Sequence, residues 1–141
     1  MHVLVPIDGS NPADEALNHA LEQFPDASIT AVYVMDPIDG ATAWGPAGAE
    51  DWMAAAEQRA EEILDAAASR GAEAGVELET DSVLGRPSRA IIDYADEHDV
   101  DHIVVGSHGR DGVSRVLLGS VAEVVVRRST VPVTVVRAKA D

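Results

Sequence analysis

The stretch HIVVGSHGRDGVSRVLLGSVAEVVVRRSTVPVTVV, residues 102–136, contains the pattern that decides the fold. Within it, Ile103-Val104-Val105 is a short apolar run typical of a buried parallel strand. A loop over 106–118 follows, then a helix from Gly119 to Arg128 and a strand from Val131 to Val136. A strand, a helix and another apolar strand in this order predict two parallel strands joined by a right-handed crossover.

The rest of the chain repeats this alternation of strands and helices. Val3 to Ile7 predicts a buried strand that stops at Asp8-Gly9-Ser10. Asn11-Pro12 then predicts the N-cap and the first position of a helix, which Pro25 ends. The further expected elements are a strand over 29–35, a loop over 36–49, a helix over 50–74, a strand over 76–84 near a sheet edge, and a helix that begins at Pro87.

This alternation predicts the class of fold. We expect one α/β domain over residues 1–141, with a doubly wound five-stranded parallel sheet in the order 3-2-1-4-5 and helices on both faces. In such sheets, ligands bind beyond the carboxyl ends of the strands, at the point where the strand order reverses. The ends of the first and fourth strands, at Asp8 and Gly106, should therefore lie side by side.

The composition narrows the classes of function. The formal net charge is −15, which argues against a nucleic-acid binder because such proteins need a basic face. The chain has no cysteine, which excludes a thiol nucleophile and a cysteine-ligated metal. It has no long apolar run and no basic leader, so we expect no membrane association and a cytoplasmic location. The acidic surplus indicates either a halophilic protein adapted to high cytoplasmic salt or simply an acidic one.

The charge is unevenly spread along the chain. Residues 1–81 hold 17 acidic and 2 basic residues, whereas residues 102–140 hold only Asp111 and Glu123 against 6 basic residues. A locally positive stretch in a strongly acidic protein is a candidate site for a small anion.

The positive stretch contains the spacing G-x2-G-x9-G-S, from Gly106 to Ser120. Gly106 and Gly109 would let backbone amides approach an anion without a Cβ in the way. Gly119 and Ser120 would place free N–H groups and a hydroxyl at a helix N-terminus, where the dipole favours phosphate, and Ser120 would also be the N-cap. The alternative is that the glycines only form turns and the serine only caps. The complete spacing favours a phosphate site, to which His108 adds a donor.

Together with segments along nearly the whole chain, this spacing resembles the universal stress protein family in its ATP-binding branch. The similar segments are residues 5–10, 34–36, 104–110, 118–122 and 131–136. The resemblance implies an ATP site formed by Pro6, Ile7, Asp8, Val34, Val105, Gly106, His108, Gly109, Gly119, Ser120 and Val121. In that site the Asp8 carboxylate accepts from ribose hydroxyls and the Val34 backbone meets the adenine edge. By itself, an aspartate after a strand can equally cap a turn.

The resemblance also implies a homodimer formed through the strand Val131 to Val136, although Pro132 limits the hydrogen bonding of that strand. A divalent cation, Mg²⁺ or Mn²⁺, would bridge the phosphates. We assign it no protein ligand, because no cluster of acidic residues is dedicated to it.

Three functions compete for this chain. The first is a regulatory module in stress response whose conformation or partner choice depends on bound ATP; ADP, AMP or a cyclic nucleotide could replace ATP. The second is a slow ATPase or a nucleotide-dependent transferase, for which His108 is the one acid–base candidate in the spacing. The G-x4-G-K-[ST] loop is missing, so we assign no catalytic residue. The third is a phospho-receiver, which needs an acidic pair after the first strand, where Asp8 stands alone.

Overall fold

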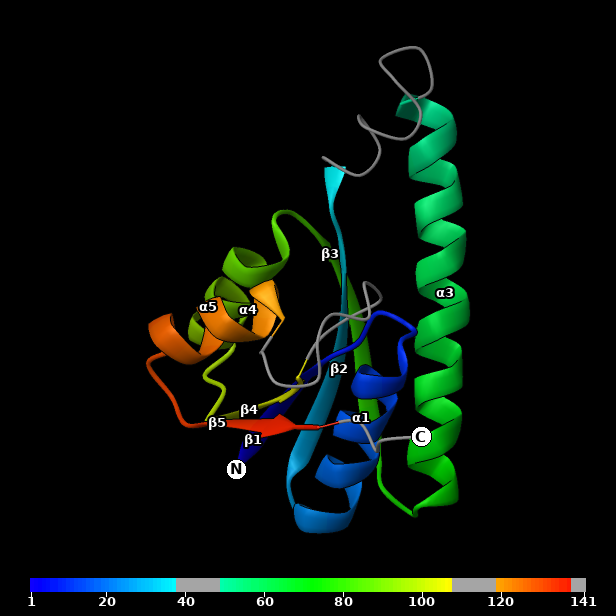
Figure 1. Cartoon of the computed structure of the whole chain (residues 1–141). Helices are drawn as coiled ribbons and strands as arrows, with labels where there is room; N and C mark the ends of the chain where they lie inside the picture. Colours follow the sequence, from blue (N-terminus) through cyan, green and yellow to red (C-terminus); the bar gives the residue numbers. More distant parts are fainter. Residues whose placement is uncertain (38–48, 108–118, 138–141) are drawn as a thin grey trace.

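The computed structural model describes residues 1–37, 49–107 and 119–137. These form one parallel sheet in the order β3-β2-β1-β4-β5, which confirms the predicted fold (Figure 1). Most element bounds agree with the prediction to within about two residues. The elements are β1 His2–Pro6, α1 Asn11–Gln23, β2 Ser28–Met35, α3 Ala49–Glu73, β3 Leu78–Leu84, α4 Pro87–Glu97, β4 His102–Gly106, α5 Ser120–Arg128 and β5 Val133–Val136.

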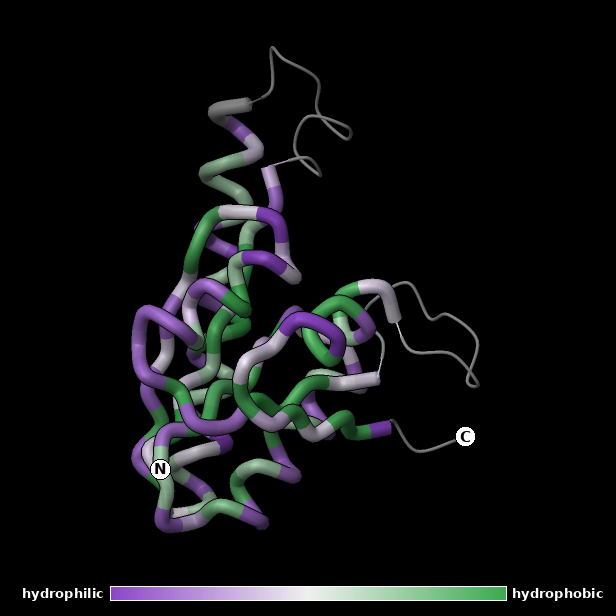
Figure 2. Tube along the Cα trace, turned by 90° about the vertical axis from the view of Figure 1, so that its left-hand side faces the viewer, coloured by the Kyte–Doolittle hydropathy of each residue, from purple (hydrophilic) through white to green (hydrophobic). Residues whose placement is uncertain are grey.

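The sheet is covered on both faces, as a doubly wound fold requires. Helices α1 and α3 lie on one side, and α4 and α5 lie on the other (Figure 1). Successive side chains of β1 point to opposite faces of the sheet, because side chains alternate along a strand. Val3 and Val5 pack toward α1 and α3, whereas Leu4 packs toward α4 and α5. Both hydrophobic and hydrophilic residues occur along the helices in Figure 2, as expected for helices with one buried face.

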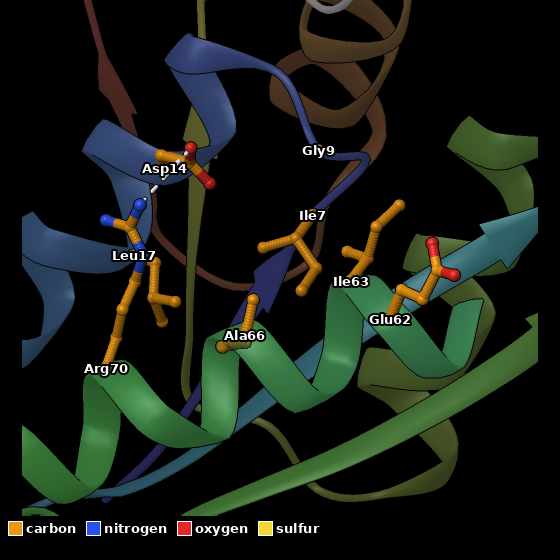
Figure 3. A pocket seen from close by; sticks show the side chains of 9 residues that line it. Ile7, Gly9, Asp14, Leu17, Glu62, Ile63, Ala66 and Arg70 are labelled. Carbon is orange, nitrogen blue, oxygen red and sulfur yellow. Dashed lines mark ion pairs between the residues drawn. The ribbon is translucent and has the colours of Figure 1, made fainter. Parts of the chain in front are cut away.

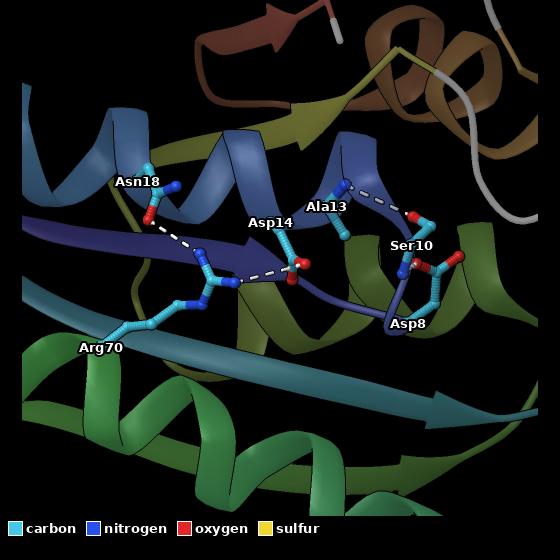
Figure 4. Close-up of polar contacts among 6 residues, drawn as sticks. All are labelled: Asp8, Ser10, Ala13, Asp14, Asn18 and Arg70. Atoms are coloured by element: carbon cyan, nitrogen blue, oxygen red, sulfur yellow. Dashed lines mark hydrogen bonds and ion pairs between the residues drawn. The ribbon is translucent and has the colours of Figure 1, made fainter.

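The start of α1 differs from the prediction by one residue. The N-cap is Ser10, not Asn11, and Ser10 has an extended backbone at φ −84° and ψ 160°. Its hydroxyl accepts a hydrogen bond from the Ala13 N–H at 3.3 Å (Figure 4). This contact gives a first-turn donor the partner that an N-cap normally supplies. Asn11 and Pro12 are therefore the first two residues of the helix.

The two edge strands differ in character. At the β3 edge, Glu79 and Asp81 are exposed, and charges of this kind discourage pairing with another chain. At the β5 edge, all four residues from Val133 to Val136 are half-buried and none is charged. The predicted edge position of both strands is confirmed. None of the helices in the described ranges is both long and apolar enough to cross a membrane.

His102, at the start of β4, makes the stability of the fold depend on pH. Its Nε2 lies 2.7 Å from the Thr134 hydroxyl oxygen on β5. Burial, and then the charge of His19, lower the pKa of His102 below its ordinary value of 6.5. The unfolded chain therefore binds this proton more readily than the folded chain. The resulting stability is present above pH 6.5 and is lost as the pH falls through the lowered pKa.

We expect the free energy of unfolding to fall less steeply between about pH 7 and pH 5 in His102→Gln than in the wild type. Glutamine can still hydrogen-bond to Thr134 but cannot take up the proton. Urea unfolding at a series of pH values measures the two slopes. Because both proteins keep every other titrating group, parallel slopes would show that His102 contributes nothing to the acid sensitivity.

Candidate functional site

The strand order reverses between β1 and β4, which pair directly through Val3 with His102 and Leu4 with Ile103. Beyond its carboxyl end, β1 leads into α1 on one face of the sheet. The next helix after β4 is α5, on the opposite face (Figure 1). The predicted neighbourhood of the two strand ends is therefore confirmed. A doubly wound sheet offers its ligand site at this point.

Asp8 lies half-buried just beyond the end of β1. Its Oδ1 accepts a hydrogen bond from the Ser10 N–H at 3.0 Å (Figure 4), so the side chain does cap the turn. Its Oδ2 has no hydrogen-bond partner among the residues that the structure describes. A carboxylate has several acceptor positions, so Asp8 can hold the turn and still accept from a ligand hydroxyl.

Gly106, at the end of β4, is enclosed by the first turn of α1. A Cβ added to Gly106 would lie 2.6 Å from the Pro12 carbonyl carbon, 2.7 Å from its oxygen and 2.8 Å from its Cβ. No side chain fits there, because two of these atoms belong to the backbone. The structure thus gives Gly106 a packing role that the spacing argument did not include. Glycines at the strand ends of nucleotide-binding folds commonly allow such close helix packing.

The start of α5 also differs from the prediction by one residue. Gly119, at φ −66° and ψ 159°, is the N-cap, and Ser120 is the first helical residue. Because glycine has no side chain, it forms no side-chain cap of the kind that Ser10 makes at α1. Within the described part of the chain, the backbone N–H groups of Ser120, Val121 and Ala122 have no acceptor. Free N–H groups at a helix start form a ready site for an anion.

Ser107 is a site residue that the sequence reasoning missed. It is 8 % exposed, and its backbone N–H donates to the Val136 carbonyl at 2.9 Å. Its own carbonyl accepts from the Gly119 N–H, so it ties β4 to the start of α5. The prediction of a free N–H at Gly119 is therefore wrong, and the free N–H groups begin at Ser120. Its hydroxyl has no partner within the described ranges, and a buried unpaired hydroxyl calls for an explanation. In the spacing G-x2-G, Ser107 occupies a position where any residue is allowed, so the spacing did not indicate it. Its location directly after a buried strand could have indicated a site residue.

The structure places the other predicted residues in different surroundings. Val34 and Val105 pack on the α4 and α5 side of the sheet. The Ile7 side chain, 6 % exposed, is instead packed on the α1 and α3 side, and its N–H donates to the Val32 carbonyl at 2.8 Å. Pro6 closes β1, and Val121 is exposed at the start of α5. His108 and Gly109, and nearly all of the predicted loop over 36–49, lie outside the described residues.

No group of three or more His, Asp or Glu residues in the described ranges could hold a metal ion. Near the start of α5, the described acidic side chain on the helix is Glu123, which pairs with Arg127 at 3.0 Å. The site therefore offers N–H donors, a serine hydroxyl and one carboxylate, a combination suited to a ligand that carries both phosphate and hydroxyl groups.

A doubly wound α/β domain with an open helix start beside its switch point belongs to the class of folds that bind nucleotides and other phosphate-bearing ligands. A model of one family in this class, the universal stress protein family, matches residues 1–137. This chain belongs to the universal stress protein family.

Similar proteins agree with this assignment. Universal stress protein MJ0531 of Methanocaldococcus jannaschii is 35 % identical, over 96 % of this chain and 81 % of the relative. The solved structure of MJ0577 from the same organism, described as a hypothetical protein whose biochemical function was assigned from its structure, superposes with a TM-score of 0.86 at 27 % identity, covering 99 % of this chain and 97 % of the other. A universal stress protein in complex with cAMP superposes with a TM-score of 0.70 at 27 % identity, covering 99 % and 98 %.

Proposed function

We propose that this chain binds an adenine nucleotide, with ATP as the expected ligand. We propose further that it acts in the cytoplasm as a regulatory module of the stress response. The observation that carries the proposal is the pairing of two features at one strand reversal. The Asp8 carboxylate, which has one free oxygen, follows β1. The start of α5, which has no side-chain cap, comes after the neighbouring strand β4. The first suits a sugar hydroxyl and the second suits a phosphate.

Each part of the nucleotide would meet a distinct group of this chain. The N–H groups of Ser120 and Val121, with the Ser120 hydroxyl, would bind phosphate oxygens. The Asp8 carboxylate would accept from ribose hydroxyls, and the backbone of Val34 would meet the adenine edge. The bound cAMP in a related universal stress protein supports an adenine nucleotide as the kind of ligand. Ser107 would place its unpaired hydroxyl beside the same helix start.

A divalent cation, Mg²⁺ or Mn²⁺, would be held mainly by the phosphates themselves. This is the usual arrangement for Mg²⁺, which keeps several waters and takes few protein ligands. The described residues around the helix start fit this arrangement, because they supply donors for phosphate rather than a set of carboxylates for the metal. The cation would neutralise part of the phosphate charge in a protein whose formal net charge is −15.

The proposed role is binding rather than catalysis. At the start of α5 the described residues offer N–H donors and a hydroxyl, and Glu123 is paired with Arg127. The alternative, a slow ATPase or a nucleotide-dependent transferase, rests on His108, which lies outside the described residues.

Titration calorimetry tests the proposal directly. We expect ATP to bind, GTP to bind at least about tenfold more weakly, and inorganic tripolyphosphate to bind more weakly still, because it lacks both ribose and base. Titrations at two KCl concentrations would show the phosphate contribution, which salt screens. Failure of ATP to bind at either concentration contradicts the proposal, and equal binding of tripolyphosphate contradicts the adenosine half of the site.

The proposal includes a homodimer formed through β5. The carbonyls of Pro132 and Val136 accept from the N–H groups of Ile103 and Ser107, at 3.0 and 2.9 Å, so these two positions face β4. Backbone groups alternate in direction along a strand, and the N–H of Val135 therefore faces the open edge. Pro132 lacks its N–H on the side toward β4, so it does not block the outer edge.

We expect the wild type to sediment as a dimer and Val135→Pro to sediment as a monomer that keeps its circular dichroism spectrum. Proline removes the outward N–H of Val135 and leaves the hydrogen bonds to β4 in place. Analytical ultracentrifugation over a range of concentrations measures the change. A folded Val135→Pro protein that remains dimeric would place the interface elsewhere.

A further inference from the structure

The turn between β1 and α1, residues Asp8 to Ser10, sets the direction of the Asp8 carboxylate. Asp8 accepts from the Ser10 N–H at 3.0 Å, and Ser10 in turn accepts from the Ala13 N–H at 3.3 Å. Gly9, between them, has φ +84°, a conformation that other residues rarely adopt. This short chain of contacts holds one carboxylate oxygen and leaves the other free. Whatever keeps the turn in place also keeps that free oxygen in place.

The side chain of Ile63, from α3, lies directly against this turn. A Cβ added to Gly9 would be 3.3 Å from Ile63 Cδ1 and 3.5 Å from its Cγ1. Figure 3 shows Ile63 reaching from α3 toward the turn. A cavity of about 220 Å³ adjoins this contact, between α1 and α3. The neighbours within 4 Å of a Cβ at Gly9 are both atoms of Ile63, so this side chain is the one that meets the turn directly.

A second, polar link between α1 and α3 reaches the first turns of α1, where the Asp14 N–H donates to the Ser10 carbonyl at 3.0 Å. Arg70 donates to the Asn18 side-chain oxygen at 3.1 Å and pairs with Asp14 at 3.4 Å (Figures 3 and 4). Both side chains of the ion pair are 38 % exposed, so solvent weakens it. Arg70 lies about two helical turns beyond Ile63. Arg70 links the two helices at that position, and Ile63 is the residue of α3 that meets the turn.

We infer that Ile63 is a positioning residue for the nucleotide site: through Gly9 it holds the turn that directs the free carboxylate oxygen of Asp8 toward the ribose. The inference rests on the proposed function and adds a residue on α3, on the far side of the turn from the phosphate cradle. It predicts an effect confined to ribose recognition. Loss of the Ile63 side chain should spare the phosphate contacts, which belong to α5.

The test compares ATP with 2′,3′-dideoxy-ATP, which lacks the hydroxyls that Asp8 would bind. We expect the wild type to bind ATP about tenfold more tightly than the analogue, the value of one hydrogen bond to a charged group. In Ile63→Ala this ratio should fall to about one to two, and Ile63→Val, which loses only the nearest carbon, should give an intermediate ratio. Leu64→Ala is the matched control, because it shortens a partly buried side chain on the same helix.

A second readout needs no nucleotide. In the ligand-free protein, NMR hydrogen exchange of the Ser10 N–H should be faster in Ile63→Ala and Ile63→Val than in Leu64→Ala, because that N–H is held by Asp8. A wild type that prefers ATP, with the same preference in Ile63→Ala and Ile63→Val, overturns the inference and leaves the proposed function standing. A wild type that binds no adenine nucleotide overturns the proposed function. Ser10 exchange would then still show whether Ile63 holds the turn.

Discussion

Gly119→Val is expected to abolish ATP binding while the protein keeps its fold. Gly119 is the buried N-cap of α5, and the free N–H groups of the helix start directly after it. A branched side chain at this point would cover the first of them. The backbone of Gly119, at φ −66° and ψ 159°, is allowed for any residue, so its conformation does not require glycine.

The expected loss of affinity is at least about 100-fold, since a phosphate makes several hydrogen bonds to such a cradle. Calorimetry with ATP measures the loss, and thermal unfolding without ligand checks the fold. Gly119→Ala should give an intermediate affinity, because its side chain is smaller. We expect the same loss for Gly109→Val, the second glycine of the spacing. Normal binding by both valine variants would mean that the phosphate cradle is assigned to the wrong residues.

Gly106→Ala should damage the fold rather than the site. The added Cβ would lie 2.6 Å from the Pro12 carbonyl carbon, and the helix α1 would have to move away from β4. Overpacking against backbone of this kind costs about 3 kcal/mol. For a domain of this size, that is a fall of roughly 10 °C in Tm.

Gly75→Ala is the matched control, because a Cβ at Gly75 would meet nothing within 4 Å. Its φ of +73° still makes alanine unfavourable, by about 1 kcal/mol. Differential scanning calorimetry on both variants measures the difference. If Gly106→Ala unfolds at the temperature of Gly75→Ala or higher, the close crossing of α1 over β4 is not the reason for glycine at residue 106.

The sheet could be predicted because each strand is indicated by a short local stretch of the sequence. Apolar runs such as Val3 to Ile7 and Ile103 to Val105 are too short and too β-branched to be helices, and general rules of crossover and strand order then arrange them. The N-caps of α1 and α5 were each predicted one residue too far toward the C-terminus. The N-cap is decided by backbone conformation, and a serine, an asparagine or a glycine can each take that place.

The site could be predicted in outline and not in detail. Topology alone brings Asp8 beside the end of β4, and the glycine spacing alone indicates the start of α5. The contacts of Gly106 with Pro12 and of Gly9 with Ile63 join residues far apart in the sequence. A single sequence does not show which distant residues pack together, so these contacts could not be predicted. The single domain over 1–141 and the adaptation to high salt remain predictions, and a rise of Tm with KCl would support the second.

Identification of the small molecule that co-purifies with the protein tests the central claim, a nucleotide-binding role, most directly. The chain would be purified in high salt, denatured to release bound small molecules, and these would be identified by chromatography and mass spectrometry, followed by titration of the emptied protein with ATP. We expect ATP that stays intact on the folded protein over hours. Steady release of ADP that disappears in His108→Ala would contradict a binding role. The absence of any adenine nucleotide, together with no binding in the titration, would contradict the nucleotide site itself.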